Sequence, residues 1–193
     1  MSRDALLDKV TAYAAERGIA DKSLREMAAG VGTSHRMLLY HFGSREGLLA
    51  AIVAAVEEQQ RAVLAELSQR GEGGDPAAVM VGLWEQVSQP ALRPLVRLFF
   101  AAVGLAVQGV PGTEALLDNL TTGWLDRGGE AAQRFGLPSD PAVLRLGVAV
   151  SRGLLLELVA GADPAEVDAS YGLFVEMWQR WIEIHSGRPG EIG

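Results

Sequence analysis

The side chains best suited to contact a charged partner are concentrated in "TSHRMLLYHFGSREGLL", residues 33–49. On a helix of 3.6 residues per turn, Leu38, Leu39 and Phe42 fall on one side, where we expect them to pack inward. The opposite side carries a mixture of basic, aromatic and thioether side chains, namely Arg36, Met37, Tyr40 and His41. Such a face can both hydrogen-bond and make apolar contacts, so the pattern indicates a contact surface.

The charge of the chain is unevenly distributed. The whole chain of 193 residues has a net charge of -7. Residues 1–49 carry seven basic and six acidic side chains, and the remaining residues carry ten basic and eighteen acidic ones. An acidic surface repels a polyanion, so the N-terminal quarter is the only part of the chain suited to approach one.

Composition excludes several kinds of chemistry. Cysteine is absent, which excludes disulfides, thiol catalysis and thiolate metal sites. The three histidines, at positions 35, 41 and 185, have no acidic partner at zinc-ligand spacing. We find no Ser/His/Asp set, phosphate-binding loop or paired catalytic carboxylates. We therefore expect no metal, no cofactor and no enzymatic activity.

Neither the N-terminus nor the apolar runs indicate a membrane protein. The longest apolar run, residues 98–107, has ten residues, whereas a helix needs ~20 to cross a bilayer. The first ten residues carry charges where a signal peptide would have an apolar core. We expect a cytoplasmic protein with no membrane partner.

The whole chain predicts helices, so we expect an all-α fold. Residues 3–17 form the first helix, and Ser23 with Glu26 makes a capping box that starts the second. The second helix ends at a pair of glycines, after which Thr33 or Ser34 can cap a third. Two helices joined by a tight, glycine-containing turn form a helix-turn-helix motif.

Longer helices follow the first three, which makes about nine in total. Ser44 can cap a fourth helix that runs to about Arg70. Three later helices begin at a capping acid followed by proline, namely Asp75, Asp140 and Asp163. We expect a helix-turn-helix domain over residues 1–46 and a helical domain over residues 47–193.

Residues 18–49 also contain a more specific pattern than a helix-turn-helix. The residues that carry it, without a gap, are Gly18, Ser23, Met27-Ala28, Val31-Gly32-Thr33-Ser34, Leu38, His41-Phe42, Arg45 and Leu48. Their spacing resembles the DNA-binding domain of the TetR family of bacterial transcriptional regulators. That family shows a Gly, a Ser/Thr five residues on, and then I-A-x-x-A-G-V-S-x-G-x-L-Y-x-H-F-x-x-K-x-x-L.

Three positions depart from the family pattern. Arg36 stands where the family has Gly, Leu39 where it has Tyr, and Ala14 where an aromatic residue is usual. An arginine at position 36 can reach guanine O6 and N7, so it changes base preference without threatening the fold. Leu39 also lacks the phenol that often contacts DNA in the family, so an operator sequence cannot be carried over. The resemblance covers about a quarter of the chain.

The resemblance implies a dimer on a palindromic, double-stranded DNA operator, usually a repressor released by a small molecule. By resemblance and helical position, three side chains should meet base edges, namely His35, Arg36 and Met37. Six should hold the DNA backbone, namely Lys22, Ser23, Ser34, Tyr40, His41 and Arg45. Of these, His41 could as readily pack within the helical bundle.

The last two helices are expected to form the homodimer. In the last helix an aromatic seam recurs at spacings of four and three, namely Val167, Tyr171, Phe174, Trp178 and Trp181. Val150 and Leu154 in the preceding helix join this predicted interface. The alternative for the seam is a core stripe within one chain.

The middle of the chain is expected to bind the small molecule. Aromatic and thioether side chains there could line an apolar cavity, namely Met80, Trp84, Phe99, Phe100 and Trp124. The candidate polar contacts are Arg97, Gln108, Asn119 and Thr121. Few charges lie in this region, so the effector should be largely apolar. Each residue taken singly could instead belong to the core.

Two other functions compete with a ligand-responsive repressor. One is an all-α enzyme or carrier of hydrophobic ligands with an incidental helix-turn-helix. The other is an architectural DNA binder without an effector, which would need a more basic surface. Specific, salt-sensitive DNA binding separates the repressor from the first, and release by a small molecule separates it from the second.

Overall fold

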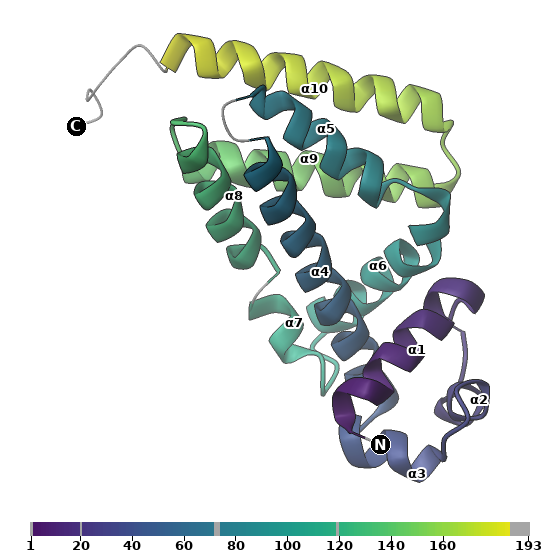
Figure 1. The fold of residues 1–193 in the computed structure, drawn as a ribbon. Coiled ribbons are helices and arrows are strands. Elements are labelled where there is room, and N and C mark those ends of the chain that lie inside the picture. The colour runs from purple at the N-terminus through teal and green to yellow at the C-terminus, as the bar shows by residue number, and fades with distance from the viewer. Residues whose placement is uncertain (1, 20, 72–73, 119, 186–193) are drawn as a thin grey trace. The chain divides into compact units, whose positions relative to one another are not determined.

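The computed structural model describes residues 2–19, 21–71, 74–118 and 120–185 (Figure 1). Every regular element within these ranges is helical, so the all-α prediction is confirmed. They contain ten α-helices and one 3-10 helix, against about nine expected, and one of the ten has only five residues. In chain order they are α1 (Arg3–Arg17), α2 (Leu24–Gly30), α3 (His35–Phe42), α4 (Arg45–Arg70), α5 (Pro76–Val87), η1 (Pro90–Leu92), α6 (Arg93–Val107), α7 (Glu114–Asp118), α8 (Thr122–Arg134), α9 (Pro141–Ala160) and α10 (Pro164–His185).

The helices form two compact units, each built from two stretches of chain. Unit 1 comprises Met1–Gln59 and Gln89–Leu120, and unit 2 comprises Gln60–Ser88 and Thr121–Gly193. The long helix α4 gives its first part to unit 1 and its remainder to unit 2. The boundary expected at residue 46 separates a DNA-binding domain from the rest of the chain, which is a functional division and not one by compactness. It stays a prediction.

Helix starts follow the capping residues that the sequence predicts. The Ser34 hydroxyl accepts a hydrogen bond from the Met37 backbone N–H at 3.2 Å, and this begins α3. The Ser44 hydroxyl accepts one from the Gly47 N–H at 2.9 Å at the start of α4. The three predicted acids accept bonds from the backbone N–H two residues on, namely Asp75, Asp140 and Asp163.

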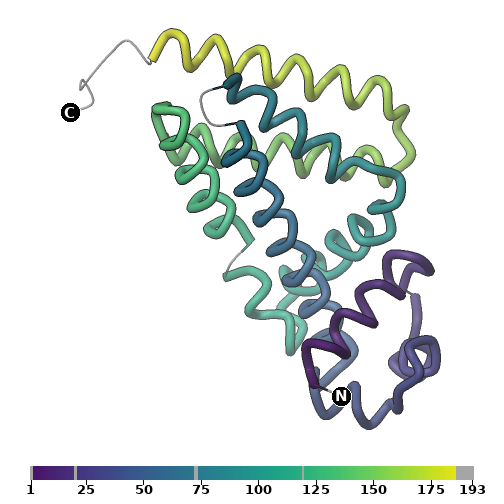
Figure 2. The backbone as a smooth tube through the Cα atoms, in the orientation of Figure 1, coloured from purple at the N-terminus to yellow at the C-terminus, as the bar shows by residue number. Residues whose placement is uncertain are grey.

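Unit 1 holds the first three helices around one hydrophobic core (Figure 2). Helix α1 packs on α6, and α2 packs on α3. Each of the helices α1, α2, α3, α4 and α6 buries side chains in this core, namely Leu6, Val10, Met27, Leu38, Leu48, Ile52, Leu98 and Ala102. Because so many helices meet there, the position of α3 within unit 1 is fixed by long-range packing.

One apolar stretch of the described residues, Pro90–Val107, is long enough to cross a membrane by length and composition alone. It comprises η1 and α6 and contains Arg93 and Arg97. Its Leu98 and other small or aliphatic side chains lie in the core of unit 1. This packing accounts for part of its apolar composition, because 22% of the stretch is buried, namely Leu95, Leu98, Ala102 and Ala106.

Unit 2 is organised by its last two helices. Helix α10 packs along α9 and α5, and α8 packs on α9 (Figure 1). Its core gathers apolar side chains from α5, α9 and α10, namely Ala77, Trp84, Leu158, Val167, Tyr171 and Val175.

Candidate nucleic-acid interface

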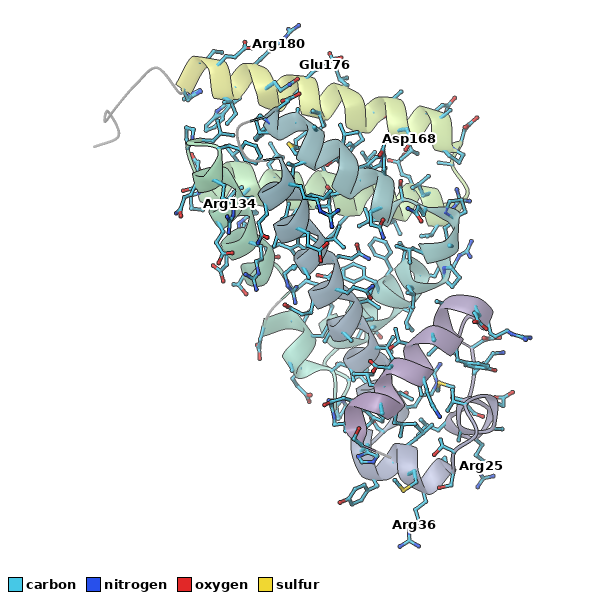
Figure 3. The ribbon with its side chains drawn as sticks, in the orientation of Figure 1. Arg25, Arg36, Arg134, Asp168, Glu176 and Arg180 are labelled. Atoms are coloured by element: carbon cyan, nitrogen blue, oxygen red, sulfur yellow. The ribbon has the colours of Figure 1, made fainter. Side chains whose placement is uncertain are left out.

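The outer face of α3 consists of three exposed side chains with two half-buried neighbours, namely Arg36, Leu39, Tyr40, His35 and Met37. Leu38 is fully buried, and Arg36 and Tyr40 lie two residues before and after it. Two residues correspond to about 200° around a helix, so both side chains point away from the core. Tyr40 is 79% exposed, and Figure 3 shows the Arg36 side chain extending away from α3. This face therefore presents a guanidinium and a phenol to solvent.

Leu39 does not pack inward as predicted. It is 38% exposed, whereas Leu38 has no exposed surface. Phe42, one turn after Leu38, packs against the core, whereas Leu39 is displaced from Leu38 by about 100° around the helix axis. The outer face of α3 is therefore more apolar than the sequence predicted.

The two serines that begin α2 and α3 differ in what they can still donate. The Ser23 hydroxyl donates to a Glu26 carboxylate oxygen at 2.7 Å, and the Ser23 backbone N–H donates to the same oxygen at 2.8 Å. Both donors of Ser23 are thus engaged in the capping box. The Ser34 hydroxyl accepts from the Met37 N–H, so its own hydrogen remains available for a phosphate oxygen.

The same capping box sets the charge state of its acid. The hydrogen bonds from the Ser23 side chain and backbone, with a smaller contribution from the charge of Lys22, lower the pKa of Glu26. Glu26 is fully exposed, so it keeps a negative charge on the surface of α2 at neutral pH. A carboxylate at this place weakens the attraction of the helix-turn-helix for phosphates.

Arg45 is engaged within unit 1. Its Nε donates to the Lys22 backbone carbonyl at 2.7 Å, and its Nη1 lies 3.6 Å from a Glu46 carboxylate oxygen. The side chain of Arg45 is 27% exposed. Lys22 itself is half-buried.

The His41 side chain is half-buried, and its two expected roles, a DNA-backbone contact and packing within the helical bundle, both stay predictions. Its ring meets the Tyr40 ring edge-on at a centroid distance of 5.0 Å, and the Phe42 ring lies 6.2 Å away. Its Nε2 is buried, and no hydrogen-bond partner for it lies among the described residues. The Arg3 guanidinium carbon lies 5.2 Å from the Phe42 ring centroid, a cation–π contact that the sequence did not indicate.

The N-terminal domain can be compared with known protein families. The sequence profile of "Bacterial regulatory proteins, tetR family" matches residues 6–52, which span α1, α2, α3 and the start of α4. This N-terminal domain is a DNA-binding domain of the TetR type, so the resemblance inferred from its motif is confirmed, and the chain is a DNA-binding transcriptional regulator. No curated protein matches the chain in sequence.

Solved structures share the fold of this chain along most of its length. A transcriptional regulator from Rhodococcus sp. Rha1 covers 92% of this chain and 95% of its own, with 20% identity and a TM-score of 0.71. A TetR-family regulator from Pectobacterium atrosepticum covers 93% of both chains, with 21% identity and a TM-score of 0.70. The TetR-family repressor AlkX from Dietzia sp. strain DQ12-45-1b, implicated in biodegradation of n-alkanes, covers 93% of this chain and 96% of its own, with 17% identity and a TM-score of 0.60.

Sequence reasoning did not consider the exposed Arg25 of this domain as a site residue. Arg25 lies in the first turn of α2, and Figure 3 shows its side chain directed into solvent from the same unit as Arg36. Its position could have been found from the helical wheel of α2, because Leu24, Met27 and Ala28 occupy the buried side.

In the aromatic seam predicted as a dimer interface, two residues are buried inside the chain and three are half-buried. Tyr171 is 5% exposed and stacks on Trp84 at a centroid distance of 4.4 Å. Val167 is buried, and three further predicted residues are packed against the same core, namely Leu154, Phe174 and Trp178. Tyr171 therefore has little surface to offer a second subunit. Trp181 is half-buried and stacks on His185, and Val150 is half-buried in α9.

The five residues predicted to line a ligand pocket are divided between the two units. Trp84 is buried in the core of unit 2, where its Nε1 donates to an Asp168 carboxylate oxygen at 2.8 Å. Met80 packs against the same core, and Trp124 is half-buried. Phe99 packs against the core of unit 1 and meets Phe100 edge-on. The polar candidates Arg97 and Gln108 are exposed, Thr121 is half-buried, and Asn119 lies outside the described residues. A shared pocket stays a prediction.

Proposed function

We propose that this protein is a dimeric repressor that binds a palindromic operator through the outer face of α3 and leaves it when a small, largely apolar molecule binds. The observation that carries the proposal is the exposure of Arg36 and Tyr40 directly opposite the buried Leu38, in a helix-turn-helix of the TetR family. We place the protein in the cytoplasm, and we assign it no enzymatic step.

Arg36 is the residue proposed to discriminate most between operator sequences. A bidentate contact from a guanidinium to guanine O6 and N7 is worth ~1–3 kcal/mol of discrimination. Met37 and the exposed Leu39 offer apolar contacts suited to thymine methyl groups, and His35 lies at the edge of the same face. Tyr40, Ser34 and other hydrogen-bond donors around the face, such as Lys22, would hold phosphates.

The dimer interface is better supported on the exposed sides of α9 and α10 than on the aromatic seam. Leu173, Met177 and Ile184 are all about 60% exposed and recur on one stripe of α10, opposite Tyr171. In α9 Leu146 is exposed, and the half-buried Val150 lies one turn further on. Exposed apolar side chains on two adjacent helices favour helix-on-helix association.

An apolar effector is supported by the composition of the middle helices and by one relative. The AlkX repressor is implicated in biodegradation of n-alkanes, and its fold covers nearly the whole of this chain. The Gln60 side chain in α4 is buried, and its Oε1 has no hydrogen-bond partner among the described residues. A buried amide oxygen is costly to leave unpaired, so we propose an apolar effector with one hydrogen-bond donor.

The first experiment measures binding to DNA from immediately upstream of the protein's own gene. Fluorescence anisotropy compares this fragment with random DNA at two salt concentrations, for the wild type, Arg36→Ala and the control Arg134→Ala. Arg134 is an exposed arginine of α8 outside the N-terminal domain (Figure 3). We expect Arg36→Ala to lose or relax specific binding and Arg134→Ala to match the wild type. Equal, weak binding of both DNAs by all three proteins would favour the ligand-carrier alternative.

Release by an effector is tested on the complex formed in that experiment. Medium-chain alcohols, which are apolar with one hydrogen-bond donor, are compared with alkanes of the same chain length. We expect the alcohols to dissociate the complex at lower concentration, and we expect Gln60→Leu to remove this difference. Persistence of the complex in both series would contradict the proposed effector class.

A further inference from the structure

Arg45 is the first residue of α4, and it reaches back to the segment that precedes α2. Its Nε donates to the backbone carbonyl of Lys22 at 2.7 Å in a partly buried setting. Lys22 directly precedes Ser23, the residue that caps α2. One hydrogen bond therefore joins the beginnings of two helices that lie far apart in sequence.

The charge of Arg45 has a partner in the next residue. Its Nη1 lies 3.6 Å from a Glu46 carboxylate oxygen, and the side chains are 27% and 30% exposed. A guanidinium that neutralises a phosphate must present its charge to solvent, as Arg36 does on α3. Arg45 instead directs one N–H group to a carbonyl and a second toward a carboxylate.

The position of this hydrogen bond allows it to influence the orientation of α3, the helix proposed to read the DNA sequence. The capping box of Ser23 and Glu26 fixes where α2 begins, and α2 packs on α3. Holding the Lys22 carbonyl therefore holds the start of α2, and through α2 it constrains the orientation of α3 in unit 1. Small errors in the orientation of such a helix weaken base contacts more than they weaken phosphate contacts.

We propose that Arg45 is a positioning residue, whose hydrogen bond to the Lys22 carbonyl orients the recognition helix and which does not itself neutralise a phosphate. This inference rests on the proposed function. It replaces the DNA-backbone contact expected for Arg45 from the sequence.

Three substitutions separate the hydrogen bond from the charge. In Arg45→Gln, the amide Nε2 is attached to Cδ as the arginine Nε is, so the donor stays in place and the charge is lost. Arg45→Lys keeps the charge but places its nitrogen one atom further along the chain. Arg45→Ala loses both. Lys22→Ala is the matched control, because it removes a predicted phosphate contact and leaves the backbone carbonyl that Arg45 binds.

The readouts are affinity for operator and for random DNA, and the dependence of log Kd on log salt concentration. Circular dichroism first establishes a temperature at which every variant is folded. We expect Arg45→Ala to lose about tenfold in operator affinity, with little change for random DNA and an unchanged salt slope. Arg45→Gln should match the wild type. Lys22→Ala should instead bind both DNAs more weakly, with a slope shallower by about 1.8, because the dimer loses one phosphate contact in each protomer.

Two results would overturn the proposal. If Arg45→Lys matches the wild type while Arg45→Gln behaves like Arg45→Ala with a shallower slope, Arg45 is a phosphate contact. If all three variants match the wild type, the hydrogen bond does not orient α3. Amide hydrogen exchange at residues 23–28, measured on the protein without DNA, tests the hydrogen bond from Arg45 to the Lys22 carbonyl independently of DNA binding. We expect faster exchange in Arg45→Ala alone, so a failure of the proposed function and a failure of this inference are distinguishable.

Discussion

Helical spacing predicts both the outer face of α3 and the aromatic seam of α10 as contact surfaces. In the structure the two differ in their exposure to solvent. Tyr40 on α3 is 79% exposed, whereas Tyr171 on α10 is 5% exposed. Tyr40 makes its ring contact with the neighbouring His41. Tyr171 stacks on Trp84 of α5, and its hydroxyl donates to the Met80 carbonyl at 3.3 Å.

The difference shows how much of a contact surface can be inferred from periodicity. A recurrence of three and four residues establishes that side chains share one side of a helix. It does not establish what covers that side. The polar and charged members of the α3 stripe favour exposure, because burying an unpaired guanidinium is costly. Aromatic stripes carry no such penalty and can pack within the chain or against a partner.

The largest expected difference is between the effects of substituting Tyr171 and Tyr40 on the free energy of unfolding. We expect Tyr171→Ala to lower the free energy of unfolding by about 3–5 kcal/mol, because it removes a buried aromatic ring that stacks on Trp84. Tyr40→Ala should change it by no more than about 0.5 kcal/mol, because the side chain is exposed. Urea denaturation checks both, and equal destabilisation would show that the two faces are not distinguished by burial.

The pH dependence of stability sharpens the same comparison. Burial raises the pKa of Tyr171 to about 12. A side-chain hydrogen bond with Ser151 has a smaller effect that lowers this pKa. The unfolded chain releases this proton near pH 10, so the contribution of Tyr171 is complete below that pH and is lost as the pH rises toward 12. We expect a loss of roughly 3 kcal/mol across this range.

Tyr171→Phe is the control for this titration, because phenylalanine keeps the ring and has no ionisable group. Thermal unfolding at several pH values between 9 and 12 should show a steeper decline in the wild type than in the variant. Parallel curves would mean that Tyr171 is not buried in solution.

A third prediction concerns the other side of α10. Met177→Glu places a charge on the exposed apolar stripe and should convert the dimer to monomers. Because both half-sites are then no longer bound together, operator affinity should fall about 100-fold. Val107→Glu, at a similarly exposed apolar residue of α6, should leave the dimer intact. Analytical ultracentrifugation distinguishes the two, and an unaffected Met177→Glu dimer would exclude this stripe.

The smallest expected effect concerns the carboxylate beside the DNA-binding face. Glu26→Gln keeps a side-chain oxygen for the capping box and removes a surface charge. We expect DNA affinity to rise about two- to fivefold at low salt and the gain to disappear at high salt. Anisotropy titrations at two salt concentrations measure this, and a salt-independent gain would point to a change in structure instead of charge.

The acid side of the stability profile tests the same residue. The pKa of Glu26 is lowered in the folded chain, so its contribution to stability is present above its unfolded value and is lost as the pH falls through the folded value. Glu26→Gln should lack this loss. Urea midpoints between pH 2.5 and 6 check the difference between the two proteins.

Local chemistry was predictable from the sequence, and contacts between distant segments were not. The caps at Ser23, Ser34, Ser44 and the acid-proline pairs depend on bonds to backbone groups two or three residues away, which the sequence displays directly. The link from Arg45 to the Lys22 carbonyl and the stacking of Tyr171 on Trp84 join residues far apart in the chain. No local pattern marks such partners, and the periodicity that locates a stripe does not say which helix will cover it.

The sequence by itself determined the helices, the helix-turn-helix and the TetR type of the DNA-binding domain, because capping, periodicity and the motif of residues 18–49 are local properties. Tertiary structure alone decided that Leu39 is exposed, that Arg45 holds a backbone carbonyl and that the aromatic seam of α10 packs inward. The physical reason is that burial is set by what other helices leave uncovered. The burial of a side chain therefore depends on side chains from the whole of its unit, and no single stretch of sequence determines it.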